Sequence, residues 1–236
     1  MQKFKYPLDK KIKNTWLISY GDLITLLITF FIMMISVESG RISTVHKWIN
    51  YQLAIATAEL NRSVSEKKIT GIDVRQDTKG VHITIQSKGM FKEGEAVPKN
   101  ELKLQLINIA KVIANLNILT LNNISSYQEE FMTFRKRGFE WNVKILVEGH
   151  TDNTSLILGS KYENNWELSA ARAQMVMRIL QKQLNLPPQF FAIKGYGEYK
   201  PLVENNSTQN RLLNRRIDII INASLLKSGA GEQLSI

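Results

Sequence analysis

The segment Val143–Asn153, with the sequence VKILVEGHTDN, decides the fold of the C-terminal half of the chain. Its first five residues, through Val147, are mostly β-branched or aliphatic, which favours a strand. Polar residues follow at once, including His150 and Asp152, and they favour a loop at the end of that strand. We therefore expect a strand that leads directly into a loop carrying a carboxylate.

The segments on either side of this strand alternate between helical and extended patterns. Downstream, apolar residues recur at helical spacing, at Leu168, Ala171, Met175, Ile179 and Leu180. A second helix is predicted over residues 98–113, with Asn100 as its N-cap. Extended patterns predict strands, the first two forming a hairpin, at 72–75, 81–85, 191–193 and 217–221. The alternation predicts an α/β two-layer domain over residues 69–224, with a long irregular connection at 117–141.

A membrane span is predicted near the start of the chain. From Trp16 to Val37 the only charged side chain is Asp22, and at about 1.5 Å per residue this stretch crosses the hydrocarbon core of a bilayer. A signal peptide would have a shorter apolar region and a small-residue cleavage site, whereas bulky residues precede Glu38–Arg41 here. We therefore expect a retained transmembrane helix over residues 16–37.

The net charge of +10 is unevenly placed. Five lysines precede the span against one acid, so residues 1–15 are expected to form a basic cytoplasmic tail, with the C-terminal domain across the inner membrane, in the periplasm. The other basic residues are scattered and do not alternate with aromatic residues, which argues against nucleic-acid binding. The chain has no cysteine, so disulfides and thiolate chemistry are excluded.

Asp22 is the most informative residue of the span. A carboxylate inside a membrane helix costs roughly 3 kcal/mol, so it indicates a function. Ser19, Thr25 and Thr29 share its helical face, which should therefore meet protein or water. The hydroxyls could instead bond to carbonyls of their own helix, but a carboxylate cannot be satisfied in that way. Because one span cannot enclose an ion path, partner subunits are implied.

Residues 38–68 join the span to the domain. Apolar residues there recur at roughly helical spacing, at Ile42, Val45, Trp48, Ile49 and Leu53. The pattern predicts a short amphipathic helix, which would pack on the domain or on a second copy of it. At the other end of the chain, residues 225–236 are expected to form a flexible tail.

The span also resembles a known family. The run Trp16–Leu27, WLISYGDLITLL, followed by Phe30 and Phe31, is similar to the transmembrane signature of MotB-family stator subunits. The resemblance implies that Asp22 carries the coupling ion, with proton and sodium both open. It also implies that the helix within the linker is a plug, which blocks ion flow until the protein is anchored. Gly21 stands where the family usually has alanine.

Three patches of the C-terminal half resemble the OmpA/MotB-like peptidoglycan-binding domain, which implies an OmpA-like α/β fold. They are VEGHTDN at 147–153, NWELSAARA at 165–173, and GYGE at 195–198 with NRRIDI at 214–219. The resemblance implies that Asp152 takes the ammonium of diaminopimelate in the peptide stem and that Arg172 takes its carboxylate with a two-pronged fork. The residues that it implies nearby are Thr151, Asn165 and Arg216.

Together the resemblances imply an ion-conducting, wall-anchored stator subunit of a membrane rotary motor of the flagellar type. The implied partners are peptidoglycan, a MotA-type polytopic membrane subunit and a second copy of this chain in a homodimer. Two alternatives stay open: a subunit of a Zorya-type antiphage motor, and a passive peptidoglycan anchor, which would have no use for Asp22. The sequence offers no Ser-His-Asp, Cys-His or metal-ligand set, so we expect no enzyme, no metal and no cofactor besides the coupling ion.

Overall fold

The computed structural model describes most of the chain and divides it into two compact units. The described residues are 15–67, 69–86, 89–92, 94–120, 128–157 and 159–227. The first unit ends at Trp48 and the second begins at Ile49. The predicted basic tail, except for Thr15, lies outside the described residues, and so does the end of the predicted C-terminal tail.

The first unit consists of the N-terminal part of helix α2, which runs continuously over Thr15–Glu66. Within it, Trp16–Ser36 is the described segment that is long and apolar enough to cross a membrane, with a mean hydropathy of 2.0. Thr25 and Thr29 donate their hydroxyl hydrogens to backbone carbonyls of this same helix, at 2.8 and 2.9 Å. These hydroxyls are therefore satisfied within the helix, and neither bond reaches the carboxylate of Asp22.

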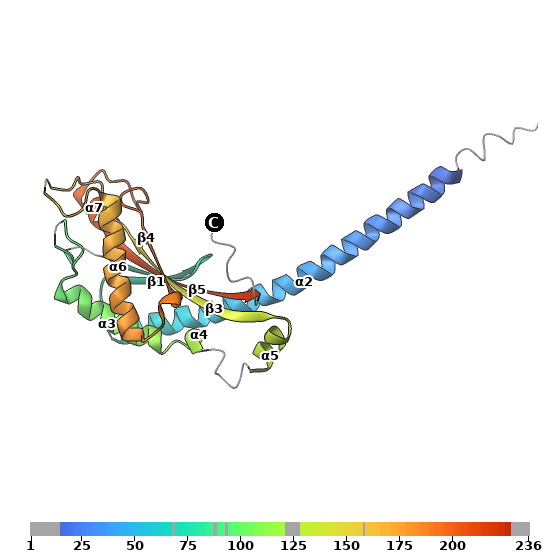
Figure 1. Cartoon of the computed structure of the whole chain (residues 1–236), viewed down its shortest axis with the longest axis horizontal. Helices are drawn as coiled ribbons and strands as arrows, with labels where there is room; N and C mark the ends of the chain where they lie inside the picture. The colour runs from blue at the N-terminus through green and yellow to red at the C-terminus, as the bar shows by residue number, and fades with distance from the viewer. Residues whose placement is uncertain are drawn as a thin grey trace, which may run out of the picture. The chain divides into compact units, whose positions relative to one another are not determined.

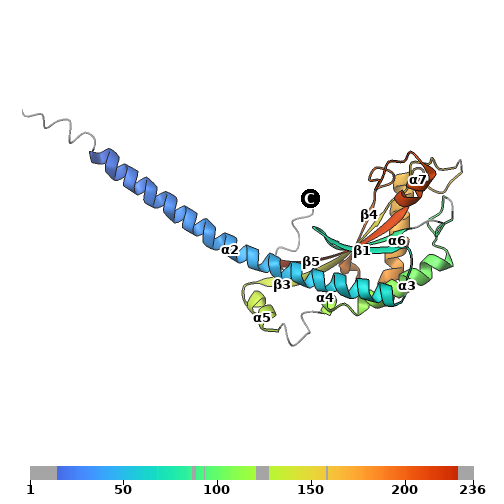
Figure 2. The ribbon, with the colours of Figure 1, turned by 180° about the vertical axis from the view of Figure 1, so that it is seen from behind.

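The second unit begins with the C-terminal part of α2, which Figure 2 shows in cyan. A stripe of apolar side chains on it is buried: Ile49, Leu53, Ala56, Leu60 and Val64. Because these residues recur every three or four positions, one helical face packs on the domain. Asn61 Nδ2 also donates to the carbonyl oxygen of Val74, 3.2 Å away in strand β1 (Ile72–Asp77). The unit therefore starts at residue 49, rather than at 69 after the predicted linker of 38–68.

Within the described residues this unit contains a five-stranded mixed sheet in the order β1-β2-β5-β3-β4 (Figure 1). The remaining strands are β2 Gly80–Gln86, β3 Phe139–Gly149, β4 Phe191–Gly195 and β5 Arg216–Lys227. β3 pairs in parallel with β4 and antiparallel with β5, and β2 pairs antiparallel with β1 and β5. The predicted hairpin is confirmed, with Asp77 opposite Gly80. Because β5 continues to Lys227, the predicted tail at 225–236 begins inside the sheet.

Helices cover the sheet. They are α3 Asn100–Ala114, α4 Asn117–Thr120, α5 Gln128–Lys136, α6 Asn165–Leu184 and α7 Thr208–Asn214, with a 3-10 helix η3 at Pro188–Phe190. The two predicted helices are confirmed as α3 and α6. The N-cap of α3 is Lys99, with no side-chain cap bond, so the prediction of Asn100 at that position was wrong. The connection predicted over 117–141 contains α4, α5 and the first residues of β3. Trp141 Nε1 donates to Ile118 O at 3.0 Å and so joins the two ends of this segment.

The core of this unit is aliphatic and is shared by the sheet and the helices. Its fully buried large side chains include Ile83, Ile145 and Ile217 from strands and Leu60, Leu102, Leu106, Ile109 and Leu180 from helices. Burying each such side chain stabilises the fold by about 1.5–3 kcal/mol. The packed core therefore includes the C-terminal part of α2, from Ile49 onward.

Two glycines let α6 lie directly on the ends of β3 and β4. A Cβ on Gly149 would collide with the backbone carbonyl of Ser169, and one on Gly195 would collide with the backbone of Ala170. The helix and the strand ends therefore approach more closely than side chains would allow. This contact places the first turns of α6 beside the loop that follows β3 (Figure 1).

Candidate functional site

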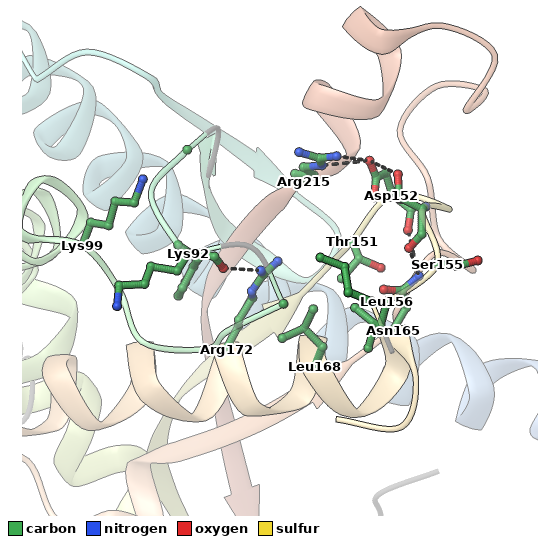
Figure 3. A pocket seen from close by; sticks show the side chains of 15 residues that line it. Lys92, Lys99, Thr151, Asp152, Ser155, Leu156, Asn165, Leu168, Arg172 and Arg215 are labelled. Carbon is green, nitrogen blue, oxygen red and sulfur yellow. Dashed lines mark hydrogen bonds and ion pairs between the residues drawn. The ribbon is translucent and has the colours of Figure 1, made fainter. Parts of the chain in front are cut away.

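A pocket of about 310 Å³ opens where the loop after β3 meets the first turns of α6 (Figure 3). Its other walls are the segment that contains Phe91 and Lys99, and Arg215 just before β5. The predicted binding residues that line it are Thr151, Asp152, Asn165 and Arg172. Arg216, the fifth predicted binding residue, is not among the described residues that line the pocket. The structure thus brings together four side chains from two separate sequence motifs.

Thr151 carries a hydroxyl that no described residue satisfies. Its backbone N–H donates to the carbonyl oxygen of Gly197 at 2.9 Å, which fixes the residue at the end of β3. The side chain is 3% exposed, and among the described residues its Oγ1 has no hydrogen-bond partner. Leaving a buried hydroxyl unpaired costs about 1–3 kcal/mol. A ligand or a water molecule in the pocket would remove that cost.

Asp152 is paired with Arg215 rather than with Arg172. Arg215 donates from Nε and Nη2 to Oδ2 of Asp152 at 2.8 and 2.7 Å, as Figure 3 shows with dashed lines. Thr154 donates its hydroxyl hydrogen to the same oxygen at 3.0 Å and its backbone N–H to Oδ1 at 3.3 Å. Oδ1 is therefore the less occupied oxygen. The carboxylate is held in place by these bonds and has capacity left for a further donor.

Arg172 reaches the pocket from α6 and is held on the opposite wall. Its Nε donates to the carbonyl oxygen of Glu95 at 3.0 Å, and its guanidinium lies 4.8 Å from the ring centroid of Phe91. Burial and the nearby charge of Arg215 lower the pKa of Arg172 to about 10, while Asp152 opposes the shift. The side chain is still cationic at neutral pH. It is thus a positioned positive charge with donors directed at the pocket.

Asn165 ties the pocket loop to α6. Its Nδ2 lies within hydrogen-bond distance of Asp152 O at 3.3 Å, Thr154 O at 3.0 Å and Glu198 Oε2 at 3.1 Å. An amide has two N–H donors, so these three acceptors share them. Asn165 therefore positions the loop that carries Asp152, in addition to lining the pocket.

Arg216, which was predicted to lie near the ligand, is not among the described residues that line the pocket, and its side chain is bonded inside the domain. Its Nε donates to Oδ2 of Asp218 at 2.9 Å, and its Nη2 donates to the carbonyl oxygen of Lys200 at 3.2 Å. The residue is 5% exposed. Adjacent side chains at the start of a strand point to opposite sides, so Arg215 enters the pocket while Arg216 turns into the interior. The sequence shows the basic pair but not which of its two side chains faces the pocket, which is why Arg215 was missed.

A buried polar network surrounds Asp218 in strand β5. Its Oδ1 accepts a hydrogen bond from Thr84 Oγ1 at 2.9 Å, and its Oδ2 lies 3.3 Å from Nε2 of His150. Burial raises the pKa of Asp218, but the contacts with His150 and His82 and the charge of Arg216 outweigh it and lower the pKa below its usual range. The carboxylate is therefore ionised, and the network holds β2, β3 and β5 together.

Three residues of this network have the donor types of a metal site: Glu148, His150 and Asp218. The guanidinium of Arg216 lies among them, with Nη2 3.4 Å from His150 Nε2. A metal ion would have to displace this buried cation and leave its charge unpaired, which is costly. The residues present therefore fit an internal ion pair better than a metal ion.

The pocket carries an excess of positive charge. Its charged lining residues are Lys92, Lys99, Arg172, Arg215 and Asp152. Asp152 is already paired with Arg215, and Lys92 and Lys99 lie on the side of the pocket away from Asp152, as Figure 3 shows. Arginine and lysine bind carboxylates well, arginine through two parallel N–H donors. The pocket is thus suited to a ligand that has more carboxylates than ammonium groups.

Comparisons with known proteins agree with both units. The family model described as "Membrane MotB of proton-channel complex MotA/MotB" matches residues 4–51, and the OmpA family model matches residues 122–215. Motility protein B of Bacillus subtilis (strain 168) is 26% identical over 98% of this chain and 97% of its own length. Motility protein B of Helicobacter pylori (strain ATCC 700392 / 26695) is 24% identical over 93% of this chain and 90% of its own length.

Solved structures are similar to the second unit. The periplasmic domain of Helicobacter pylori MotB is 25% identical, covers 67% of this chain and 83% of its own, and has a TM-score of 0.51. The cell wall anchor of the T6SS from Pseudomonas aeruginosa is 25% identical, covers 70% of this chain and 97% of its own, and has a TM-score of 0.52. The two family models match in the order membrane segment, then OmpA-like domain, and the similarity to Motility protein B extends over nearly the whole chain. The chain is therefore similar to MotB-type proteins in both of its parts, with an N-terminal apolar helix followed by an OmpA-like α/β domain.

Proposed function

We propose that this chain is the wall-anchored, ion-conducting stator subunit of a flagellar-type rotary motor. The observation that carries the proposal is the combination of an unpartnered carboxylate in the span with a cationic pocket in the OmpA-like domain. The length-wide similarity to Motility protein B and the match to the MotA/MotB plug family support it.

Asp22 is the proposed ion carrier. Among the described residues no hydrogen bond or ion pair reaches its carboxylate, although the hydroxyls of Thr25 and Thr29 lie on the same helical face. In a bilayer such a group must be protonated, hydrated or partnered by another chain. One helix cannot supply that environment, so the path requires a MotA-type polytopic subunit and a second copy of this chain. The family description names a proton channel, which favours a proton over sodium.

The pocket at the end of β3 is the proposed wall-binding site. Asp152 Oδ1, free of Arg215, would accept the ammonium of diaminopimelate, and Arg172 and Arg215 would donate to its carboxylate. Thr151, whose buried hydroxyl has no hydrogen-bond partner among the described residues, lines the same pocket. The excess positive charge of the pocket matches the further carboxylates of a peptide stem.

Sedimentation of the detergent-solubilised full-length chain with purified peptidoglycan tests the wall site. Arg172→Ala removes a charged hydrogen-bond donor set, and such bonds contribute about 1.5–3 kcal/mol, so binding should weaken about ten- to a hundredfold. Arg172→Lys keeps the charge without the two-pronged guanidinium, so its affinity for peptidoglycan should lie between those of the wild type and Arg172→Ala.

Lys161→Ala is the matched control, because it removes an exposed positive charge from the same loop region outside the pocket. It should leave binding unchanged. Suppose that Lys161→Ala weakens binding as much as Arg172→Ala does, and that salt abolishes the binding of both variants equally. The basic protein would then merely adhere to an anionic wall.

A passive wall anchor is the second candidate, favoured by the structural similarity to the cell wall anchor of the T6SS. Both candidates predict peptidoglycan binding, and they differ only in the role of Asp22. The flagellar motor and the antiphage motor also both predict peptidoglycan binding, and both of them need Asp22.

A further inference from the structure

A cluster of positive charge lies at the end of the domain opposite the pocket. We call it the basic cluster, and it consists of Arg135, Lys136 and Arg137 at the end of α5 and Lys227 at the end of β5. All four side chains are exposed. Among the residues that the structure describes, no ion pair involves any of them. Their charge is therefore not neutralised within the described part of the domain.

The fold brings the two parts of the basic cluster together. The N–H of Gly138, whose φ is +75°, donates to Arg135 O at 2.8 Å, which ends α5 and lets β3 begin at Phe139. Phe139 is directly opposite Lys227 in the antiparallel pairing of β3 with β5, so their side chains lie on the same face of the sheet. Strand alternation turns the carboxylate of Glu140 to the other face. Lys227 therefore joins the cations of α5 rather than that acid.

An apolar side chain is exposed beside these cations. Met132 is 54% exposed and lies one turn before Arg135 and Lys136, on the same face of α5. Phe134 is half-buried, and α5 packs against β3. Cations at the end of a helix also stabilise its dipole, but that accounts neither for Lys227, which is in a strand, nor for the exposed Met132. An apolar side chain among exposed cations is typical of a segment that lies in lipid headgroups.

Helix α2 enters the domain from the end that carries the basic cluster. The carbonyl oxygen of Asn50 accepts from Gln76 Nε2 at 3.3 Å, and Gln76 is level with Ile145 of β3 across the sheet. The side chain of Asn61 donates at 3.2 Å to the residue of β1 that is level with Val147. From Asn50 to Asn61 the helix thus runs toward the pocket end of β3. Its first turn in the domain lies toward the other end, where Figure 2 shows α5.

The connection to the span is short. Residues 37–48 separate the apolar segment Trp16–Ser36 from the second unit, which begins at Ile49. A chain of that length reaches at most about 40 Å when extended and about 18 Å as a helix. The pocket and the basic cluster are separated by the length of β3, roughly 30 Å. The end of the domain that is tethered to the membrane segment is therefore the end that carries the cations.

We propose that the basic cluster docks the domain on anionic lipid headgroups of the membrane that holds the span. The opposite charges attract, Met132 can enter the headgroup region, and the short connection keeps the local concentration of headgroups high. Because the pocket lies at the other end of β3, a docked domain leaves the pocket open. This docking goes beyond the proposed function and requires neither the ion path nor the wall site.

The test measures how close α5 lies to the headgroups. The chain has no cysteine, so Thr133→Cys can carry a single fluorophore at an exposed position of α5. The full-length protein is reconstituted in bilayers whose headgroups carry a nitroxide quencher. We expect quenching in equal parts of phosphatidylglycerol and phosphatidylcholine, but not in phosphatidylcholine alone or in about 1 M salt, where the Debye length is about 3 Å. A label at Leu104→Cys, 62% exposed on α3, should not be quenched.

Charge removal tests the basic cluster itself. Each basic residue near an anionic surface strengthens docking about fivefold, so removing three should lower the ratio of docked to undocked domain about a hundredfold. The triple variant is Arg135→Gln, Lys136→Gln and Arg137→Gln. The matched control removes the same charge from three exposed lysines outside the cluster and should keep the quenching. Its substitutions are Lys103→Gln, Lys161→Gln and Lys194→Gln.

Four outcomes overturn the proposal. The Thr133 label could stay unquenched in anionic bilayers while thermal unfolding shows a folded domain. Quenching could be equal in phosphatidylcholine alone, or it could survive the triple substitution. The lysine control could lose as much quenching as the triple variant, which would make the net charge of the domain the cause. Finally, the triple variant could keep its quenching but sediment less with peptidoglycan, which would assign the basic cluster to the wall.

Discussion

The span and the OmpA-like domain differ in whether their carboxylates are paired with other described side chains. In the domain, Asp218 contacts Arg216, Thr84 and two histidines, and Asp152 contacts Arg215. In the span, Asp22 has an apolar helix around it, and no described residue pairs with its carboxylate. Among the described residues, the carboxylates of Asp218 and Asp152 are thus paired within the chain, and the partners proposed for Asp22 belong to other chains.

We expect the largest effect from a substitution of Asp22, whose carboxylate pairs with no described residue. Asp22→Asn keeps the size and polarity of the side chain but cannot carry a proton or balance a cation. We expect normal insertion and assembly but complete loss of motor rotation, measured as swimming or as rotation of tethered cells. Thr29→Val is the control, because the hydroxyl of Thr29 only bonds to its own helix. Torque in the Asp22→Asn protein would contradict the assignment of the ion path to Asp22.

We expect the next-largest effect from a deletion in the segment that joins the span to the domain. The plug predicted within 38–68 is testable only outside the stripe that begins at Ile49, because that stripe belongs to the core. Removing residues 42–48 deletes about two helical turns and leaves every residue of the stripe in place. In cells that express the polytopic partner, we expect increased ion leak and slower growth. Unchanged cytoplasmic pH and growth would identify the segment as a spacer.

Within the domain, the adjacent arginines separate folding from binding. Arg216→Ala leaves a buried carboxylate without its cation and should lower the free energy of unfolding by about 3 kcal/mol. Arg215→Ala should cost less stability, because Arg215 is 39% exposed in its side chain and solvent screens its pair, but it should weaken peptidoglycan binding more. Thermal unfolding and sedimentation measure the two effects. The reverse ranking in stability would contradict the assignment of Arg216 to the interior.

The difference between the regions also explains what the sequence could predict. The span, the hairpin, the strand through Val147 and the helix at 165–184 follow local periodicity, and the structure contains them all. The packing of Ile49–Val64 on the domain and the choice of Arg215 as the partner of Asp152 depend on contacts between distant segments. Periodicity records which face of a helix is apolar but not what covers it, so it could not show that the second unit begins at Ile49 or that Arg215, rather than Arg216, lines the pocket.

The smallest effect concerns the pH dependence of domain stability. Hydrogen bonding to Asp218 and then to Asp77 raises the pKa of His82, despite burial and the charge of Arg75. A raised pKa in the folded state stabilises the protein fully below the ordinary histidine pKa of about 6.5, and this contribution is lost as the pH rises through the raised value. Burial raises the pKa of Asp77 and Asp218, but their partners lower it overall, so their contribution is present above about 4 and is lost on acidification.

Stability should therefore be greatest between about pH 4 and pH 6.5 and fall on both sides. His82→Gln should flatten the alkaline side of the melting-temperature profile and leave the acidic side, which depends on the carboxylates. His46→Gln is the matched control, because His46 is exposed and lies in the first unit. If His46→Gln flattened the alkaline side and His82→Gln did not, the titrating group would lie outside the domain. The network around Asp218 would then hold β2 and β5 together without change above about pH 4, because its carboxylates stay ionised there and His82 would not titrate.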